Sequence, residues 1–180
     1  MEALKEQLFT TDYIYSLSEG KRAELIDGIV YDLAAPSGTH QRISMFLSSS
    51  IYNYIQTREG DCSVFAAPYA VFLDNNDYTC VEPDISVICE KNKMDEKGCH
   101  GAPDWIIEIV SPATRRMDYM IKLFKYKSAG VKEYWIVDPE EKAVKVYNFA
   151  AQEYGDYSFT DSVPVGIYPG FEISLQSENK

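Results

Sequence analysis

The feature that most constrains this chain is a short apolar run with one acid inside it, from Trp105 to Val110 (WIIEIV). A run of this length, rich in β-branched residues, predicts a strand that is buried on both faces. Burying the carboxylate of Glu108 in such a strand is costly unless a metal or a hydrogen-bonding partner binds it. The run therefore predicts either a functional site or a buried ion pair at Glu108.

A second acid, Asp84, opens another strand-like apolar stretch at residues 85–89 (ISVIC). Because side chains alternate along a strand, Glu108 shares its face with Val110. We expect the carboxylates of Asp84 and Glu108 to converge on one cation, and oxygen ligands of this kind suit Mg²⁺ or Mn²⁺. The alternative interpretations are a plain turn at residues 82–84 and a structural salt bridge at Glu108.

A helix is predicted over residues 114–129, with Gly130 as its C-terminal cap. Lys122 on this helix is the candidate for stabilising charge on a phosphate or orienting a water molecule. Asp118 precedes it by four residues, so a surface ion pair is the alternative interpretation. The apolar stripe expected to face the core consists of Met117, Met120, Ile121 and Phe124.

The remaining pattern mixes strands and helices. An Asp-Gly pair at residues 27–28 lies between two apolar runs and is typical of a β-hairpin. The order of strand, helix and strand across residues 105–138 predicts a right-handed βαβ crossover. We expect a mixed β-sheet with helices on its faces, in one domain spanning residues 1–180. Further expected elements are helices at 11–18 and 39–57, strands at 62–66, 69–74, 84–89, 133–138 and 143–149, short strands within 153–175, and a loop at 90–103.

The charge distribution is uneven. The net charge of −11 argues against a protein whose whole surface binds nucleic acid. Residues 111–132, however, carry six basic residues and one acid, a local charge of +5 against −16 for the remainder. A basic helix beside an acidic pair is compatible with a phosphodiester substrate, and a solvated helix face is the alternative interpretation.

Location and redox state follow from what the sequence contains. No stretch approaches the roughly 20 apolar residues of a membrane helix, and the N-terminus has no signal-type segment. We therefore expect a cytoplasmic protein without membrane contact. The four cysteines contain no C-x-x-C pair. Neither a disulfide framework nor a structural zinc site is expected from such spacing.

Five stretches of the chain together resemble a known family. They are ELIDG at 24–28, HQRIS at 40–44, EPD at 82–84, EIVSPAT at 108–114, and the segment 118–139 with its GVKEYWIVDP ending. This combination resembles the Uma-two family of restriction-endonuclease-like proteins, within the PD-(D/E)XK nuclease superfamily. The resemblance covers roughly residues 10–150. It implies a restriction-endonuclease-like α/β fold with a central mixed β-sheet flanked by α-helices.

The resemblance also implies roles for particular residues. It makes Asp84 and Glu108 the metal-binding acids and Glu24 an additional acid of the site. The superfamily pattern has a lysine two residues after the second acid, where this chain has Val110. Lys122 is the position that matches the lysine of this family, displaced to the helix. His40 lies in one of the matching stretches and is interpreted as a local hydrogen-bonding residue at a helix start.

Two hypotheses of function follow. The first is a Mg²⁺- or Mn²⁺-dependent endonuclease that hydrolyses phosphodiester bonds in DNA, with Asp84, Glu108, Lys122 and Glu24 as its site. The second is a catalytically inactive nuclease-fold module that binds nucleic acid or a protein partner. The intact acids favour the first, and the acidic net charge and Val110 favour the second. The resemblance further implies a homodimer, because many nucleases of this fold class act as dimers.

Overall fold

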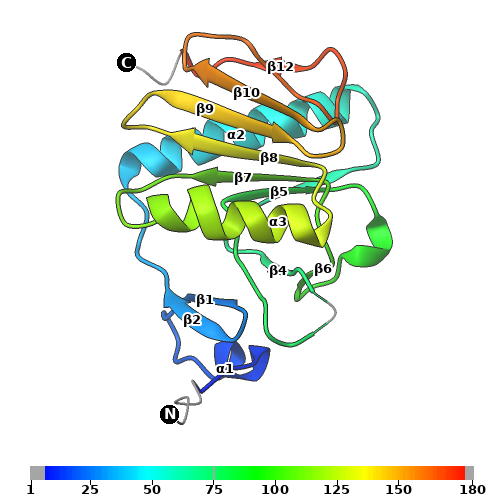
Figure 1. Ribbon diagram of the computed structural model, residues 1–180. Coiled ribbons are helices and arrows are strands. Elements are labelled where there is room, and N and C mark those ends of the chain that lie inside the picture. The colour runs from blue at the N-terminus through cyan, green and yellow to red at the C-terminus, as the bar shows by residue number, and fades with distance from the viewer. Residues whose placement is uncertain (1–6, 75, 177–180) are drawn as a thin grey trace.

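The computed structural model describes residues 7–74 and 76–176 and is built around one six-stranded sheet (Figure 1). The strands lie in the order β10-β9-β8-β7-β5-β3. Only β7 and β8 are parallel among these neighbours, so the sheet is mixed, as predicted. The bounds are β3 Ser63–Ala66, β5 Ile85–Ile88, β7 Trp105–Ile109, β8 Glu133–Asp138, β9 Ala143–Asn148 and β10 Glu153–Ser158.

The parallel pair β7 and β8 is joined by the predicted crossover helix. A π-helical segment, η2 (Met117–Lys122), continues directly into α3 (Leu123–Ala129). Gly130 ends α3 with a φ of 94°, a left-handed conformation that glycine adopts without a Cβ clash. In Figure 1, α3 lies across the front of the sheet, so the crossover helix covers one sheet face.

The other face of the sheet is covered by α2 (Gly38–Thr57). Its apolar residues recur every four positions and form one stripe against the odd-numbered residues of β7. The buried contacts on this face include Ile43, Leu47, Ile51 and Ile55 of α2 with Trp105, Ile107 and Ile109 of β7.

Among the described residues, no helix is both long and apolar enough to cross a membrane.

The even-numbered residues of β7 face α3. Ile106 and Val110 belong to the core cluster that contains Tyr126 of α3. Glu108 lies between them in the strand and contacts the same helix. The prediction that Glu108 and Val110 share one face is therefore confirmed, and this face places the acid under the crossover helix.

The Asp-Gly hairpin forms a separate two-stranded sheet, which lies below the main sheet in the view of Figure 1. Asp27 and Gly28 both have positive φ, 51° and 79°, as a tight hairpin turn of this kind requires. Leu25 and Cys80 exchange two backbone hydrogen bonds of 2.8 Å, which attach the hairpin to the rest of the chain. The bounds here are α1 Thr11–Tyr15, β1 Ala23–Ile26 and β2 Ile29–Asp32.

Residues 90–103, expected as a loop, contain more structure than the sequence indicated. A 3₁₀ turn, η1 (Lys91–Lys93), is followed by β6 (Gly98–His100). β6 pairs in parallel with β4 (Ala70–Phe72), a partner that lies far back in the sequence. The short pair β11 (Val163–Pro164) and β12 (Glu172–Ile173) completes the described elements.

The predicted orientation of the crossover helix is wrong in part. Met120 and Phe124, expected in the core, are 62% and 68% exposed, whereas Asp118, Lys122 and Tyr126 are buried. The physical reason lies in the sheet beneath, where Glu108 is buried and requires charged and hydrogen-bonding partners. The helix therefore turns its polar stripe inward, and the interpretation of Asp118 and Lys122 as a surface pair is also wrong.

One disulfide contradicts the expectation that the cysteines stay reduced. Cys62 and Cys89 are joined by an S–S bond. The register of β3 and β5 sets Ser63 opposite Ile88, and one further step sets the two cysteines opposite each other. The remaining cysteines, Cys80 and Cys99, are free and buried. Spacing along the sequence could not show the bridge, because the pairing of the strands creates it.

Candidate active site

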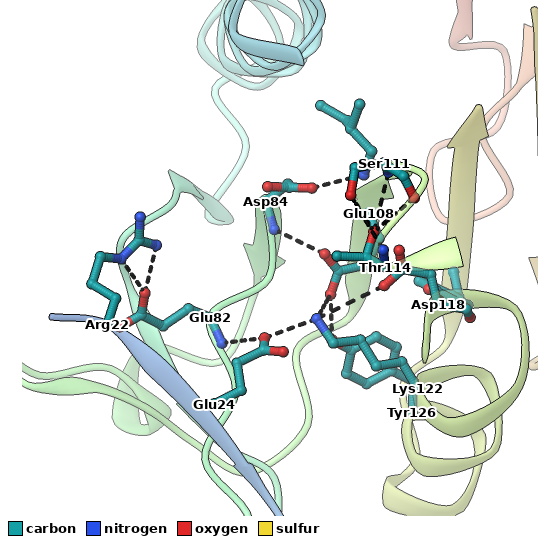
Figure 2. Close-up of polar contacts among 12 residues, drawn as sticks. Arg22, Glu24, Glu82, Asp84, Glu108, Ser111, Thr114, Asp118, Lys122 and Tyr126 are labelled. Carbon is teal, nitrogen blue, oxygen red and sulfur yellow. Dashed lines mark hydrogen bonds and ion pairs between the residues drawn. The ribbon is translucent and has the colours of Figure 1, made fainter. Parts of the chain in front are cut away.

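Two acids meet where β5 begins and β7 ends. The antiparallel register sets Ile85 opposite Ile107, which brings Asp84 opposite Glu108. The Asp84 backbone N–H donates to Oε2 of Glu108 at 3.3 Å, and the Ile109 N–H donates to Oδ2 of Asp84 at 2.7 Å (Figure 2). The register of the sheet therefore sets Asp84 beside Glu108, and the contact between the two residues runs through the Asp84 backbone N–H.

Glu108 receives two strong contacts from the helix above it. Lys122 Nζ donates to Oε1 of Glu108 at 2.9 Å, and Tyr126 donates its hydroxyl proton to the same oxygen at 2.6 Å. Burial raises the pKa of Glu108 well above its usual value, and the positive charge of Lys122 opposes this rise. The side chain is thus a buried acid that depends on its helix partners.

Lys122 stands among three carboxylates. Its Nζ lies 2.8 Å from Oε1 of Glu24 and 3.9 Å from Oδ1 of Asp118, in addition to the contact with Glu108. Burial lowers the pKa of Lys122, but the three acids more than offset this effect and hold it well above 10.5. The three acids therefore favour the charged form of Lys122, and its ammonium group reaches the site from the helix.

The π-helical turn aligns these helix residues. Asp118 and Lys122 lie within η2, and Tyr126 follows in α3. A π-helical segment is wider than an α-helical one, so residues four apart lie nearly above one another, and such segments are frequent at functional sites. The three side chains consequently form one inward row toward Glu108.

Glu24 enters from the hairpin. Its Oε1 accepts hydrogen bonds from Lys122 Nζ at 2.8 Å and from the backbone N–H of Glu82 at 2.9 Å. Arg22 binds the side chain of Glu82 through Nε at 2.8 Å, so the hairpin is held beside the segment that leads to Asp84 (Figure 2). All four residues predicted for the site, Glu24, Asp84, Glu108 and Lys122, thus belong to one connected cluster.

The sequence alone did not single out Tyr126 or Asp118 as members of the cluster. The available signal was their spacing of four residues on either side of Lys122. His40 was interpreted as a local residue at a helix start, and its backbone N–H does donate to the capping Ser37 hydroxyl at 3.2 Å. Its ring has a further contact, because Nε2 lies 3.0 Å from Oδ2 of Asp84.

The fit to a cation depends on Asp84 and Glu108. Within residues 7–74 and 76–176, no group of three or more His, Cys, Asp or Glu side chains is arranged to hold a metal ion. Mg²⁺, however, is usually bound through one or two carboxylates together with water and phosphate oxygens. Asp84 and Glu108 supply two neighbouring acids for that pattern, and they do not form a complete protein cage.

Asp84 and His40 are the most exposed side chains around the cluster. The side chains of Asp84 and His40 are 19% and 15% exposed. Those of Glu24, Glu108, Asp118 and Lys122 are almost completely buried. A ligand that enters the site therefore meets Asp84 first.

The comparisons with known proteins give the family and the fold of the chain. The family Uma2, described as "Putative restriction endonuclease", matches residues 10–176. The chain belongs to the Uma2 family. No curated protein matches it. The solved structures that resemble it include the crystal structure of a "putative nuclease belonging to DUF820" from Anabaena variabilis ATCC 29413, with a TM-score of 0.76 and 24% identity over 94% of this chain and 97% of that chain.

The structural likeness confirms the predicted fold class, a mixed α/β nuclease-like fold with a central mixed sheet and helices. The family match extends beyond the stretches that carried the resemblance, since it reaches residue 176. Family and fold together support a nuclease role for this Uma2 protein. Val110 is a buried core residue beside Glu108, so the position where the superfamily pattern has lysine is apolar here.

Proposed function

We propose that this Uma2 protein is a metal-dependent endonuclease that hydrolyses phosphodiester bonds in DNA. The observation that carries the proposal is the pairing of Asp84 and Glu108 across β5 and β7, with the Lys122 cation on Glu108. A structural ion pair alone needs only one carboxylate for each cation. The second acid, at the more exposed side of the cluster, is what a catalytic site requires.

Each residue has a distinct role in the proposal. Asp84 and Glu108 would hold Mg²⁺ or Mn²⁺, which when bound activates water and stabilises charge on a phosphate. Lys122 has three N–H donors, and two of them bind Glu24 and Glu108. Asp118 lies 3.9 Å from the same ammonium group, and we assign the third donor to a phosphate oxygen or the attacking water. Glu24 supports the site by holding Lys122.

Fewer basic residues of segment 111–132 are free to contact the DNA backbone than the sequence indicated. Four of the six basic residues of segment 111–132 form ion pairs with acids of this chain. Arg116 and Lys127 are exposed and have no ion pair among the described residues. These two are our candidates for phosphate contacts, which position DNA without reading its sequence.

The second candidate function is an inactive nuclease-fold module that binds nucleic acid or a protein partner. The observations that favour it are the burial of Glu24, Glu108 and Lys122 and the apolar Val110. In this interpretation the buried charges are structural, and the two acids bind no cation. The homodimer implied by the family resemblance is a separate proposal, which light scattering on the purified protein tests.

A plasmid-nicking assay with Mg²⁺ or Mn²⁺ separates the two functions. We expect nicking by the wild type and its loss in Asp84→Asn and Glu108→Gln. Asp61→Asn is the matched control, because Asp61 is an exposed acid that pairs with Lys91 at the surface. No nicking, together with no heat of Mn²⁺ binding in calorimetry, would establish the inactive module. Full activity in Lys122→Ala would show that the lysine is assigned wrongly.

A further inference from the structure

The two oxygens of the Glu108 carboxylate have different partners. Oε1 accepts hydrogen bonds from Lys122 Nζ at 2.9 Å and from the Tyr126 hydroxyl at 2.6 Å. Oε2 is bonded only to the Asp84 backbone N–H, at the longer distance of 3.3 Å, among the described residues (Figure 2). One oxygen is thus held by the helix, and the other is turned to Asp84.

Tyr126 is the more rigid of the two helix partners. Its side chain is completely buried, and its ring packs edge-on against Tyr134 with centroids 4.9 Å apart. The phenol donates its proton to Oε1 of Glu108 at 2.6 Å. Lys122, by contrast, is a flexible point charge shared among several carboxylates. The tyrosine is therefore the group that can fix the plane of the carboxylate.

We propose that Tyr126 is a positioning residue, which holds Oε1 of Glu108 so that Oε2 points toward Asp84, where a cation would be held. The part of this inference that concerns the cation rests on the proposed function. The part that concerns the orientation of Glu108 does not, because it follows from hydrogen bonds within the chain. Partners that orient ligating carboxylates typically change metal affinity by 10–100-fold when they are removed.

Tyr126→Phe tests the proposal, because it removes one oxygen and keeps the ring. Tyr134→Phe is a closely matched control, since Tyr134 is equally buried and its ring touches that of Tyr126. The Tyr134 hydroxyl donates to the Asp118 backbone carbonyl at 3.1 Å and does not contact Glu108. Calorimetric titration with Mn²⁺ alone should give about tenfold weaker binding for Tyr126→Phe. The control should bind Mn²⁺ as the wild type does.

A second measurement needs no metal. The Asp84 N–H is bonded to Oε2 of Glu108, so its exchange with deuterium reports the orientation of that carboxylate. We expect several-fold faster exchange of this amide in Tyr126→Phe and no change in Tyr134→Phe. Circular dichroism confirms that both variants are folded before either measurement.

The two measurements distinguish failure of the Tyr126 proposal from failure of the proposed function. Wild-type exchange at Asp84 in the Tyr126→Phe variant overturns the proposal, whatever the metal affinity, because the tyrosine then does not orient Glu108. Faster exchange with unchanged Mn²⁺ binding also overturns it, since the orientation then does not serve a cation. If the wild type binds no Mn²⁺, the proposed function fails, and the exchange of the Asp84 amide still decides whether Tyr126 positions Glu108.

Discussion

Oε1 of Glu24 and Nζ of Lys122 lie 2.8 Å apart although 98 residues separate them in the sequence. This buried contact joins the hairpin to the crossover helix, and the same ammonium group also binds Glu108. The charges of the cluster are therefore interdependent. Removing the lysine leaves three buried acids, Glu24, Glu108 and Asp118, without their cation.

Lys122→Met should lower the free energy of unfolding by about 3–5 kcal/mol, which is typical of removing one partner from a buried ion pair. Lys125→Met is the control on the same helix, because Lys125 pairs with the exposed Asp27. Surface pairs of this kind contribute less than about 1 kcal/mol. Urea denaturation of both variants measures the difference, and equal losses would contradict a buried network.

The ionisation of Asp118 should make the free energy of unfolding fall as the pH rises. Burial raises the pKa of Asp118 from 3.8 to about 6. The folded protein therefore binds this proton more tightly than the unfolded chain does. The contribution of Asp118 to stability consequently falls as the pH rises from about 4 to about 6, and it stays constant above that range. At roughly 1.4 kcal/mol per pH unit, the loss reaches about 3 kcal/mol.

Asp118→Asn does not titrate and should lack this loss. The free energy of unfolding of the variant relative to the wild type should increase by about 3 kcal/mol between pH 4 and pH 6.5. Urea denaturation at both pH values gives the comparison, in which all other titrating groups are common to both proteins. A relative stability that does not change with pH would be incompatible with a raised pKa at Asp118.

The disulfide between Cys62 and Cys89 should stabilise the fold by about 2–4 kcal/mol, because it closes a long loop in the unfolded chain. Dithiothreitol should therefore lower the midpoint of urea unfolding of the wild type. The double variant Cys62→Ser/Cys89→Ser should start from the lower midpoint and not respond to the reductant. A response of the double variant would assign the effect to another group.

The two free thiols, Cys80 and Cys99, should not react with thiol reagents in the native state. Burial raises the pKa of Cys80 to about 12 and that of Cys99 to about 11, so neither forms an appreciable thiolate at neutral pH. A thiol reagent such as Ellman's should label neither cysteine in the folded, oxidised protein and both after unfolding. Rapid labelling of Cys80 or Cys99 in the native protein would contradict their burial.

Phe124 provides a test of the helix orientation. Since its side chain is 68% exposed, Phe124→Ser should change the free energy of unfolding by no more than about 0.5 kcal/mol. Leu47→Ala on α2 is the contrasting variant, because Leu47 is completely buried and its truncation should cost about 2–5 kcal/mol. Thermal or urea unfolding distinguishes them, and a large loss at Phe124 would mean that the apolar stripe faces the core.

Much of the fold was predictable because local patterns and tertiary structure agree. The Asp27-Gly28 turn, the apolar strand around Glu108 and the crossover to β8 each follow from residues that are neighbours in the sequence. The adjacency of Asp84 and Glu108 was also predictable, since Asp84 directly precedes one apolar strand and Glu108 lies within another. Their metal binding and the catalytic roles of the cluster remain predictions.

The errors share a physical cause. The orientation of the crossover helix was read from its own apolar stripe, but the buried charge of Glu108 decides which side faces the sheet. The Cys62–Cys89 bridge and the pairing of β4 with β6 likewise depend on partners that are distant in the sequence. The pattern of residues within one segment does not show which charged or hydrogen-bonding partners the segment packed against it requires.

The Cys62–Cys89 bridge has a topological consequence for self-association. The bond closes a covalent ring that contains β3, and β3 is one of the two edge strands of the main sheet. Edge strands are the elements that molecules most readily exchange with one another. A strand inside a covalently closed ring cannot be exchanged with a second molecule unless the disulfide is reduced. The oxidised protein is therefore protected from domain swapping through β3.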